Sequence, residues 1–443
     1  MNGTLFFLLD SIVFFALSYL LVFLRHGELS ASLFVKELWV FVPIFLLVSF
    51  VVWLFSFYDV KQLRKRKIAY KSLAIAGFIS LISSAAMIYF IAALPFHLPT
   101  PRRILIVILL VYFSYIYFLR RNYFKLDAAK INVYLFGQSA TLQQLSAEMA
   151  SSRGFKVRAW EQTPSAQRHY SLRNLDYVVI GSKLFAQQPE AWDIISRDFI
   201  AKGAVVDTDF NVYEKILRRS SRESIEDNEW LLRGIGSRQE NTIYPLLKRA
   251  ADVVLALLML PFLLPLAVLI WVLIRVIDGY APLFIQKRVG QLEKPIYIYK
   301  FRTIKPGGTE ENITRCGKIL RRFRLDEIPQ LFNVLRGDIS FVGPRPIWFN
   351  EHEFLQQYVP NHALRTLVKP GITGWAQLNF KAPPTYFNSR EHSPENLDPV
   401  AFEAAFTRFS YDVWYIKNRS LLLDFEIMIK TGLRMFIKDS KVS

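Results

Sequence analysis

Four long apolar runs near the N-terminus place the strongest limit on how this chain can fold. Each is long enough, or nearly so, for an α-helix to cross the roughly 30 Å hydrocarbon core of a bilayer. The runs are Leu5–Leu24, Leu38–Tyr58, Leu73–Leu94 and Ile104–Leu119. Hydrophobic residues make up 52% of the 443 residues, which is high for a soluble protein. The sequence therefore predicts a membrane protein with a four-helix transmembrane bundle over residues 1–125.

Basic residues between the apolar runs predict the orientation of this bundle. They gather after the second run and again after the fourth run, whereas the other two loops are less basic. The two groups are Lys61, Arg64, Lys65, Arg66, Lys67 and Lys71, and then Arg120, Arg121, Lys125 and Lys130. Because basic loops are retained in the cytoplasm, both ends of the bundle and the chain that follows are expected on the cytoplasmic side.

The formal net charge of +18 restricts the partners of the chain. On a membrane protein, such an excess favours anionic lipid headgroups and phosphorylated substrates. No recognisable nucleic-acid-binding module is present, so nucleic acid is not expected as a partner. The single cysteine, Cys316, rules out a disulfide within the chain and argues against a zinc site.

Residues 130–210 alternate predicted strands with predicted helices, which is typical of a small, doubly wound parallel sheet of the Rossmann type. The predicted strands are Ile131–Phe136, Phe155–Trp160, Tyr177–Ile180 and Ala204–Val206, and the helices lie near Ala140–Ala150 and Glu190–Lys202. Dinucleotide binding needs clustered glycines after the first strand, and here Gly137 stands alone. A structural role, such as pairing two copies in a homodimer, is favoured over cofactor binding. Residues 211–242 are charged and irregular and are interpreted as a connector.

A fifth apolar segment, Val253–Ile274, is long enough to span a bilayer if it is straight. Pro261 and Pro265 lie in its middle, where they are expected to break or kink a helix. Both of its flanks are basic, with Lys248-Arg249 before it and Arg275 and Lys287-Arg288 after it. A crossing would therefore leave one basic flank outside the cell. The sequence favours a re-entrant, non-spanning helix over residues 248–276, at the start of an α/β catalytic domain over 243–443. An ordinary kinked crossing is the alternative.

The segment Leu320–Pro346 carries the candidate chemistry. Asp326 and Glu327 follow an arginine cluster, and Asp326 is expected to begin a helix that has Pro329 in its first turn and Gly337 at its end. A carboxylate at that position faces unpaired backbone N–H groups, which favour its ionised form. An ionised carboxylate among phosphate-binding arginines can attack phosphorus. The simpler interpretation is a helix cap with surface ion pairs.

The sequence RRFRLDEIPQLFNVLRGDISFVGPRP resembles the core signature of the bacterial polyprenyl-phosphate sugar-1-phosphate transferases, the monotopic phosphoglycosyl transferases. Further matching segments are Lys300–Thr303, Lys369–Gln377 and Tyr411–Asp424, so the resemblance covers roughly Ile243–Gly432 in the expected order. It implies a broken, monotopic helix at the cytoplasmic face of the bacterial inner membrane. Larger members of this family have a similar bundle and Rossmann-like module before the transferase.

The resemblance also implies roles for individual residues. Asp326 would attack the β-phosphate of a UDP-sugar and bind Mg²⁺, and Glu327 would position or deprotonate the polyprenyl phosphate acceptor. The implied phosphate-binding residues are Lys300, Arg302, Arg321 and Arg345. The implied nucleotide or sugar contacts are Pro344, Thr373, Trp375 and Gln377. The expected product is polyprenyl-diphosphate-sugar, the first intermediate of exopolysaccharide, capsule or O-antigen synthesis, and the sequence does not specify the sugar.

Several alternatives stay open at this point. The chain is either this enzyme or a catalytically inactive membrane scaffold of a glycan-assembly complex; a UDP-sugar dehydratase using the middle domain is disfavoured by the single glycine. Val368–Gln377 is predicted to be a tight loop at the site, although Gly371 and Gly374 fit plain turns equally well. Phe409–Asn418 and Leu421–Phe436 are predicted to lie in the headgroup plane or to pack in the core.

Overall fold

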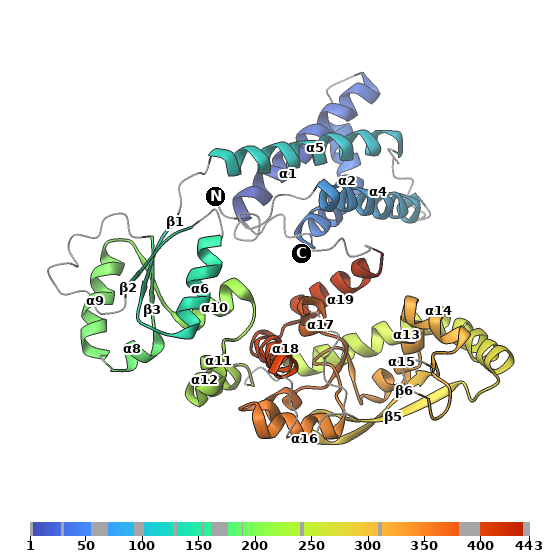
Figure 1. The fold of residues 1–443 in the computed structure, drawn as a ribbon. Helices are drawn as coiled ribbons and strands as arrows, with labels where there is room; N and C mark the ends of the chain where they lie inside the picture. The colour runs from blue at the N-terminus through green and yellow to red at the C-terminus, as the bar shows by residue number, and fades with distance from the viewer. Residues whose placement is uncertain are drawn as a thin grey trace. The chain divides into compact units, whose positions relative to one another are not determined.

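The protein is represented by a computed structural model, shown in Figure 1. It describes residues 3–27, 31–54, 70–92, 102–126, 131–151, 155–160, 176–187, 189–239, 243–308, 312–380 and 399–436. The chain divides into two compact units. One contains Met1–Gln138 and Leu142–Val206, and the other contains Ser139–Thr141 and Asp207–Ser443.

The first unit begins with four apolar helices. They are α1 (Gly3–His26), α2 (Ala31–Leu54), α4 (Tyr70–Ala92) and α5 (Arg102–Leu126). Side chains from all four share one core, in which Phe14 packs its ring against the rings of Phe45 and Tyr112. The predicted helices are confirmed, whereas their crossing of a membrane stays a prediction. Residues 55–58 and 93–94 of the predicted spans, and the basic loop over 61–69, lie outside the described residues.

A four-stranded sheet follows in the same unit. The order of its strands is β2-β1-β3-β4, and β1 runs parallel to both β2 and β3. The strands are β1 (Ile131–Phe136), β2 (Phe155–Trp160), β3 (Tyr177–Ile180) and β4 (Val205–Thr208), and the helices are α6 (Ala140–Ser151), α8 (Ser182–Gln187) and α9 (Pro189–Ala201). The predicted parallel sheet is confirmed for β1, β2 and β3 by this order and these two pairings. The short helix α8 was not predicted.

The segment predicted to be an irregular connector is helical instead. It forms α10 (Asp209–Leu217), α11 (Arg222–Glu226) and α12 (Asn228–Gln239), and it belongs to the second unit. Side-chain oxygens at the helix starts explain this: Thr208 accepts from the backbone N–H of Asn211, and Ser221 from that of Ser224. Ile225 and Leu231 then pack into a core with Phe409. Polar caps and a few buried apolar residues thus stabilise helices within a charged sequence.

The long apolar helix α13 (Ile243–Leu273) opens the next part and continues as a π-helical turn, Ile274–Asp278. Among the described residues it is the one helix long and apolar enough to cross a membrane. Most of its apolar side chains are exposed, and Phe262 reaches 79%. The sequence predicts a break or a kink at Pro261 and Pro265. Helical structure continues through both prolines, so the break is wrong, whereas the kink stays a prediction.

The remaining elements form the α/β body of the second unit. They are β5 (Leu283–Val289), β6 (Pro295–Phe301), α14 (Arg315–Phe323), α15 (Gln330–Arg336), β7 (Ser340–Val342), α16 (Phe349–Tyr358), β8 (Gly371–Thr373), α17 (Trp375–Asn379), α18 (Pro399–Asn418) and α19 (Leu421–Phe436). Strands β5 and β6 form an antiparallel hairpin, and β7 pairs with β8 in parallel. The apolar residues of α13, α15 and α18 meet in a common core.

The predicted tight loop Val368–Gln377 is wrong in detail, because it contains strand β8 and the start of α17. Glycines permit this close packing. A Cβ atom on Gly371 would lie 2.1 Å from the backbone nitrogen of Gly343, and one on Gly374 would lie 2.2 Å from the carbonyl oxygen of Gly343. These glycines are therefore required by the contact between two backbone segments, not by a turn.

The burial of the two C-terminal helices decides between their two predicted locations, the lipid headgroup plane and the protein core. On α18, Phe409, Val413 and Trp414 are buried within the body of the unit. On α19, Leu423 and Ile427 are buried in the same core as α13. Core packing is thus confirmed for the apolar faces of both helices.

Candidate active site

The β5–β6 hairpin presents one face to a cleft in the second unit. Side chains alternate along a strand, and the antiparallel register sets Gln286 opposite Ile298 and Arg288 opposite Ile296. Of these, Gln286, Arg288 and Ile298 line the cleft, together with Lys300 further along β6. Arg302 does not join them, because its guanidinium donates to the carbonyl oxygen of Ala281 at 2.8 Å. The hairpin therefore delivers Lys300 to the cleft as predicted, and it also delivers Arg288, which was not predicted to lie there.

Asn333 fixes helix α15 against this hairpin. Its side-chain oxygen accepts from the backbone N–H of Tyr299 at 3.0 Å, and its amide nitrogen donates to the carbonyl oxygen of Tyr297 at 2.7 Å. The residue is fully buried, so these hydrogen bonds satisfy groups that water does not reach. They set the position of the turn before α15 relative to Lys300.

Asp326 and Glu327 lie on a single 3₁₀ turn, Leu325–Glu327, ahead of α15. The turn follows Arg324, which has a φ of 55°, and α15 begins only after Pro329. The expected helix end at Gly337 is confirmed, with a φ of 89°. The expected N-terminal position of Asp326 in the α-helix is wrong by about one turn. A left-handed arginine residue directly before the acidic pair marks a constrained backbone at this site.

The electrostatic surroundings of Asp326 also differ from expectation. Burial of its carboxyl group, followed by the neighbouring Glu327 charge, raises its pKa above the usual range of an aspartate. Lys300 and Arg321 act in the opposite direction and lower this pKa. The expectation that the position favours the ionised form is therefore wrong in its net effect, because desolvation and the adjacent acid outweigh the two cations.

Lys300 is the cation paired with the acidic turn. Its Nζ lies 3.8 Å from the nearer Oε1 of Glu327, and both side chains are largely buried. Burial and the nearby Arg345 lower the pKa of Lys300, whereas Glu327 and Asp326 raise it. The Lys300 ammonium group is thus a compact positive charge that interacts with both carboxylates.

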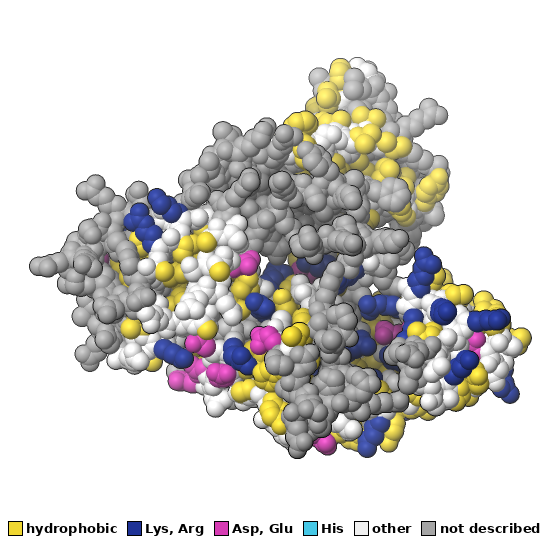
Figure 2. Space-filling model, viewed as in Figure 1, with side chains coloured by type: hydrophobic (Ala, Val, Ile, Leu, Met, Phe, Trp, Pro, Cys, Tyr) yellow, Lys and Arg dark blue, Asp and Glu magenta, His cyan; other side chains and the backbone are white. Residues whose placement is uncertain are grey.

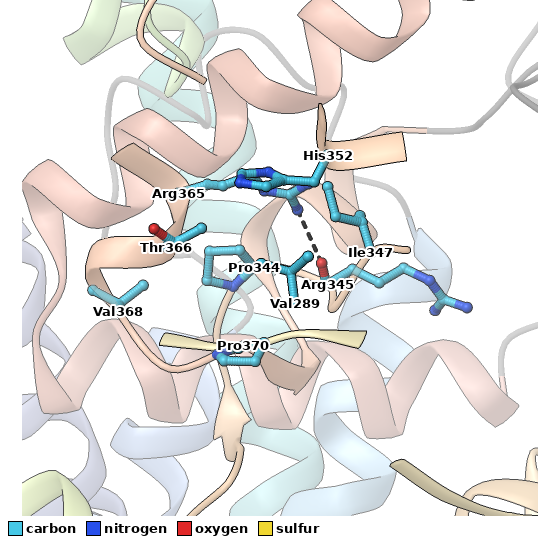
Figure 3. A pocket seen from close by; sticks show the side chains of 10 residues that line it. Val289, Pro344, Arg345, Ile347, His352, Arg365, Thr366, Val368 and Pro370 are labelled. Carbon is cyan, nitrogen blue, oxygen red and sulfur yellow. Dashed lines mark hydrogen bonds between the residues drawn. The ribbon is translucent and has the colours of Figure 1, made fainter. Parts of the chain in front are cut away.

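The turn Pro344-Arg345-Pro346 contributes a third cation, Arg345, to the cleft that Lys300 and Arg288 line. The guanidinium of Arg365 donates to the carbonyl oxygen of Arg345 at 2.9 Å, while the Arg345 side chain extends away from this contact (Figure 3). Arg365 is itself held by an ion pair with Asp412, in which Nη2 and Oδ2 are 3.1 Å apart. Both members of the pair are buried. A buried pair thus fixes the backbone from which Arg345 reaches the cleft.

The cleft brings together part of the predicted site. Its lining residues are Gln286, Arg288, Ile298, Lys300, Glu327, Gln330, Arg345, Pro346, Gly371, Ile372 and Gln377. Asp326 is not in the lining and lies beside it, on the turn that carries Glu327. Gln377 has a buried side-chain oxygen for which the described residues provide no hydrogen-bond donor. Lys300, Glu327, Arg345 and Gln377 therefore share one cleft, as the sequence predicts.

The other predicted residues lie elsewhere. Trp375 is 4% exposed, stacks near Trp414 and donates to the carbonyl oxygen of Arg218, so it is a core residue. Thr373 is buried, and its hydroxyl group bonds that of Thr431 at 2.6 Å. Pro344 belongs to the turn but lines a different pocket, which Arg365 also lines (Figure 3). Arg321 donates to the hydroxyl group of Thr303 at 2.9 Å and acts on Asp326 through its charge.

Sequence reasoning did not identify Gln286, Arg288, Gln330 or Asn333. The alternation along β5 was the available signal for Arg288, because residues 286 and 288 share a strand face. Arg288 was instead interpreted as part of a basic flank of the membrane helix. No local signal identifies Asn333, since its partners Tyr297 and Tyr299 belong to another element.

The donor set at the acidic turn fits Mg²⁺ but not a closed metal cage. Among the described residues, no group of three or more His, Cys, Asp or Glu side chains is placed to hold a metal ion. Magnesium at phosphoryl-transfer sites uses one or two carboxylates and completes its shell with substrate oxygens and water. Asp326 and Glu327 are adjacent, and the Glu327 charge raises the pKa of Asp326 because two neighbouring carboxylates repel each other. A divalent cation would reduce this repulsion.

Comparison with known proteins relates this part of the chain to a family. Residues 243–438 match the model of the bacterial sugar transferases. The chain is 33% identical over 202 residues to an uncharacterized sugar transferase, EpsL, of Bacillus subtilis, covering 89% of that protein and 44% of this chain.

Two longer relatives match the same part of the chain. A UDP-N-acetylgalactosamine-undecaprenyl-phosphate N-acetylgalactosaminephosphotransferase of Aeromonas hydrophila is 32% identical over 235 residues, which are 50% of this chain and 49% of the relative. A UDP-glucose:undecaprenyl-phosphate glucose-1-phosphate transferase of Escherichia coli is 34% identical over 202 residues, which are 43% and 40% of the two chains. The match thus spans half or less of these two relatives.

Proposed function

The chain belongs to the family of bacterial sugar transferases, and we propose that it transfers a sugar 1-phosphate from a UDP-sugar to polyprenyl phosphate. The observation that carries this proposal is the acidic turn Asp326–Glu327, beside which Lys300 and Arg345 line a cleft. Phosphoryl transfer requires a nucleophile in line with the leaving group and positive charge on the equatorial oxygens. The acidic turn supplies the nucleophile, and Lys300 and Arg345 supply the positive charge.

In the first step, a carboxylate oxygen of Asp326 attacks the β-phosphorus of the UDP-sugar. A bond forms between this oxygen and phosphorus, and the bond from phosphorus to the bridging oxygen breaks, so UMP leaves with the electron pair. Lys300 and Arg345 hold the non-bridging oxygens during this exchange. The sugar phosphate remains attached to Asp326 as an acyl phosphate.

In the second step, an oxygen of polyprenyl phosphate attacks the same phosphorus and releases the Asp326 carboxylate. The product is polyprenyl-diphosphate-sugar. Glu327 lies next to Asp326 and pairs with Lys300, so it positions the incoming phosphate or takes up its proton. A reaction divided this way follows ping-pong kinetics.

Mg²⁺, when bound through Asp326, would reduce the repulsion between the carboxylate and the substrate phosphates. The residues of the chain then orient the donor and supply the remaining positive charge.

We further propose that α13 enters the inner leaflet and returns without crossing, with the cleft at the cytoplasmic face of the bacterial inner membrane. Both ends of the helix contact the same body. Near its start, Lys248 pairs with Asp424 at 2.6 Å and Asp252 accepts from the Ser340 hydroxyl group at 3.1 Å. Near its end, Ile270 and Ile274 pack against Phe301 and Leu320. In Figure 2, apolar and basic side chains lie next to one another in this part of the molecule, as expected for a surface that meets anionic lipid.

Thiol labelling tests this re-entrant arrangement. In a Cys316→Ser background, Ile243→Cys and Ala281→Cys place one thiol before and one after the apolar helix. We expect a membrane-impermeant maleimide to label neither site in intact spheroplasts and both sites after lysis. Labelling of only one of the two in intact spheroplasts would show a crossing.

The proposed activity is tested with the purified full chain, a panel of UDP-sugars, undecaprenyl phosphate and Mg²⁺. We expect UMP release equal to the enzyme concentration without acceptor and continuous UMP release with it. The panel is needed because the two named relatives act on different sugars. Absence of UMP release from every donor would contradict the proposal.

The pH dependence of the first step provides a further prediction. Because the pKa of Asp326 is raised, the nucleophile is lost as pH falls through a value above the usual aspartate range. Because the pKa of Lys300 is lowered, its charge is lost as pH rises through a value below the usual lysine range. We expect a bell-shaped profile of single-turnover UMP release, measured without acceptor so that lipid phosphate does not titrate. Lys300→Arg should move the alkaline limb to higher pH, and an unmoved limb would exclude Lys300 as its cause.

A further inference from the structure

Arg288 lines the cleft and stacks on Trp348, which lies next to it outside the lining. The guanidinium carbon of Arg288 lies 3.7 Å from the centre of the Trp348 ring, and its Nη2 donates to the Gln286 side chain at 3.0 Å. Trp348 remains 37% exposed. A guanidinium lying on an indole ring keeps in-plane N–H groups available for an anion. The pair therefore combines hydrogen-bond donors for a phosphate group with an accessible aromatic surface.

The charged residues around the cleft, as far as the structure describes them, provide no ion-pair partner for Arg288. The lining contains three cations, Arg288, Lys300 and Arg345, and one carboxylate, Glu327, which pairs with Lys300. Among the described residues, no carboxylate oxygen forms an ion pair with Arg288 or Arg345. The nearby Glu351 instead pairs with Arg408 at 3.4 Å. Two guanidiniums facing one cleft in this way favour an anionic ligand with more than one charged group.

The position of the pair along the hairpin indicates which part of the ligand it contacts. Arg288 is opposite Ile296 in the strand register, four residues before Lys300 on β6. At the usual rise of a strand, this is about 14 Å along the hairpin from the Lys300 backbone. Lys300 is adjacent to the acidic turn that attacks the sugar-bearing phosphate. The end of the cleft at Arg288 therefore faces the nucleoside monophosphate half of the UDP-sugar, which leaves in the first step.

We propose that Arg288 and Trp348 bind the nucleoside monophosphate half of the donor, an inference that rests on the proposed function. Arg288 donates to the non-bridging oxygens of the phosphate that leaves with the nucleoside. The exposed ring of Trp348 stacks on the pyrimidine base. Arg345, between the two ends, contacts both phosphates of the donor. The subsite thereby stabilises the leaving group as the bond to phosphorus breaks.

Binding of UMP to the full chain in lipid nanodiscs tests the subsite by isothermal titration calorimetry, without turnover. We expect Arg288→Ala to weaken UMP binding about 10- to 100-fold, the usual effect of losing a charged hydrogen bond to phosphate. Trp348→Ala should weaken it about 5- to 100-fold through lost stacking. Arg288→Lys and Trp348→Phe should give smaller losses, because each retains the charge or the ring.

A matched pair on the other face of the same hairpin provides the control. Lys287 and Tyr297 are opposite each other in the register, and both are exposed. Lys287→Ala and Tyr297→Ala should leave UMP affinity unchanged. In turnover, Arg288→Ala should raise the KM for UDP-sugar and leave the KM for undecaprenyl phosphate unchanged.

Three results would overturn the subsite. The first is a wild-type protein that does not bind UMP. The second applies when the alanine variants do not fold, and it is an unchanged UMP affinity in both Arg288→Lys and Trp348→Phe. The third is an Arg288→Ala protein in which only the KM for undecaprenyl phosphate changes. The last result would place the lipid phosphate at Arg288. Failure of the proposed function can be distinguished from failure of the subsite. If the proposed function is wrong, the wild-type protein releases no UMP from any UDP-sugar, whether or not it binds UMP.

Discussion

Replacing Asp326 by asparagine is expected to lower UMP release at least about 1,000-fold, because an amide lacks the charged oxygen that attacks phosphorus. The side chain keeps its size, so the 3₁₀ turn and the neighbouring Lys300–Glu327 pair should be retained. Intact-protein mass spectrometry of the wild-type protein with UDP-sugar and no acceptor should show one added sugar phosphate. Fragmentation should locate the adduct on Asp326.

Glu353→Gln is the matched control for this change. It also neutralises a carboxylate, but on the exposed surface of α16. This variant should release UMP at the wild-type rate. An Asp326→Asn protein with substantial turnover, or an adduct on another residue, would remove Asp326 from the role of nucleophile.

Replacing Arg365 by methionine is expected to destabilise the second unit by about 3–5 kcal/mol, because Asp412 would be left buried without its cation. The change also removes the donor to the Arg345 carbonyl oxygen, so UMP release should fall as well. Thermal unfolding in detergent measures the first effect, and the KM for UDP-sugar measures the second.

The double variant Arg365→Met with Asp412→Leu separates these two effects. Two apolar residues in place of the pair should recover most of the lost stability, because no unpaired charge stays buried. The KM should remain high, since the Arg345 backbone still lacks its donor. Recovery of both properties would show that the pair acts on stability alone. Arg222→Met, at a half-exposed pair 3.8 Å from Glu226, should change neither property.

Residues whose roles depend on their own neighbours in the sequence were predicted well. Gly337 ends α15 because a left-handed residue is needed there, and the strands around Val133 and Val179 follow from short apolar runs. These predictions rest on local periodicity and turn chemistry. Lys300 also lines the cleft, but that expectation came from the resemblance of Lys300–Thr303 to the family signature and not from a local pattern.

Residues whose roles depend on distant partners were predicted poorly. Trp375 is in the core because Arg218, 157 residues away, and Trp414 surround it. Arg302 is turned away from the cleft by the carbonyl oxygen of Ala281, at the open end of the hairpin. The charged segment before Ile243 is helical because its caps are followed by residues that pack with α18. None of these contacts leaves a periodic signal in the sequence.

The Asn333 amide has a consequence for how the hairpin behaves in a crowded cell. A two-stranded ribbon normally presents a row of unpaired backbone groups on each side, and such an edge can recruit a strand from another molecule. On β6, the N–H of Tyr299 and the C=O of Tyr297 are already engaged by this one side chain. The amide thus substitutes for a third strand. It closes that edge to aggregation while leaving the face with Lys300 and Arg288 open to substrate.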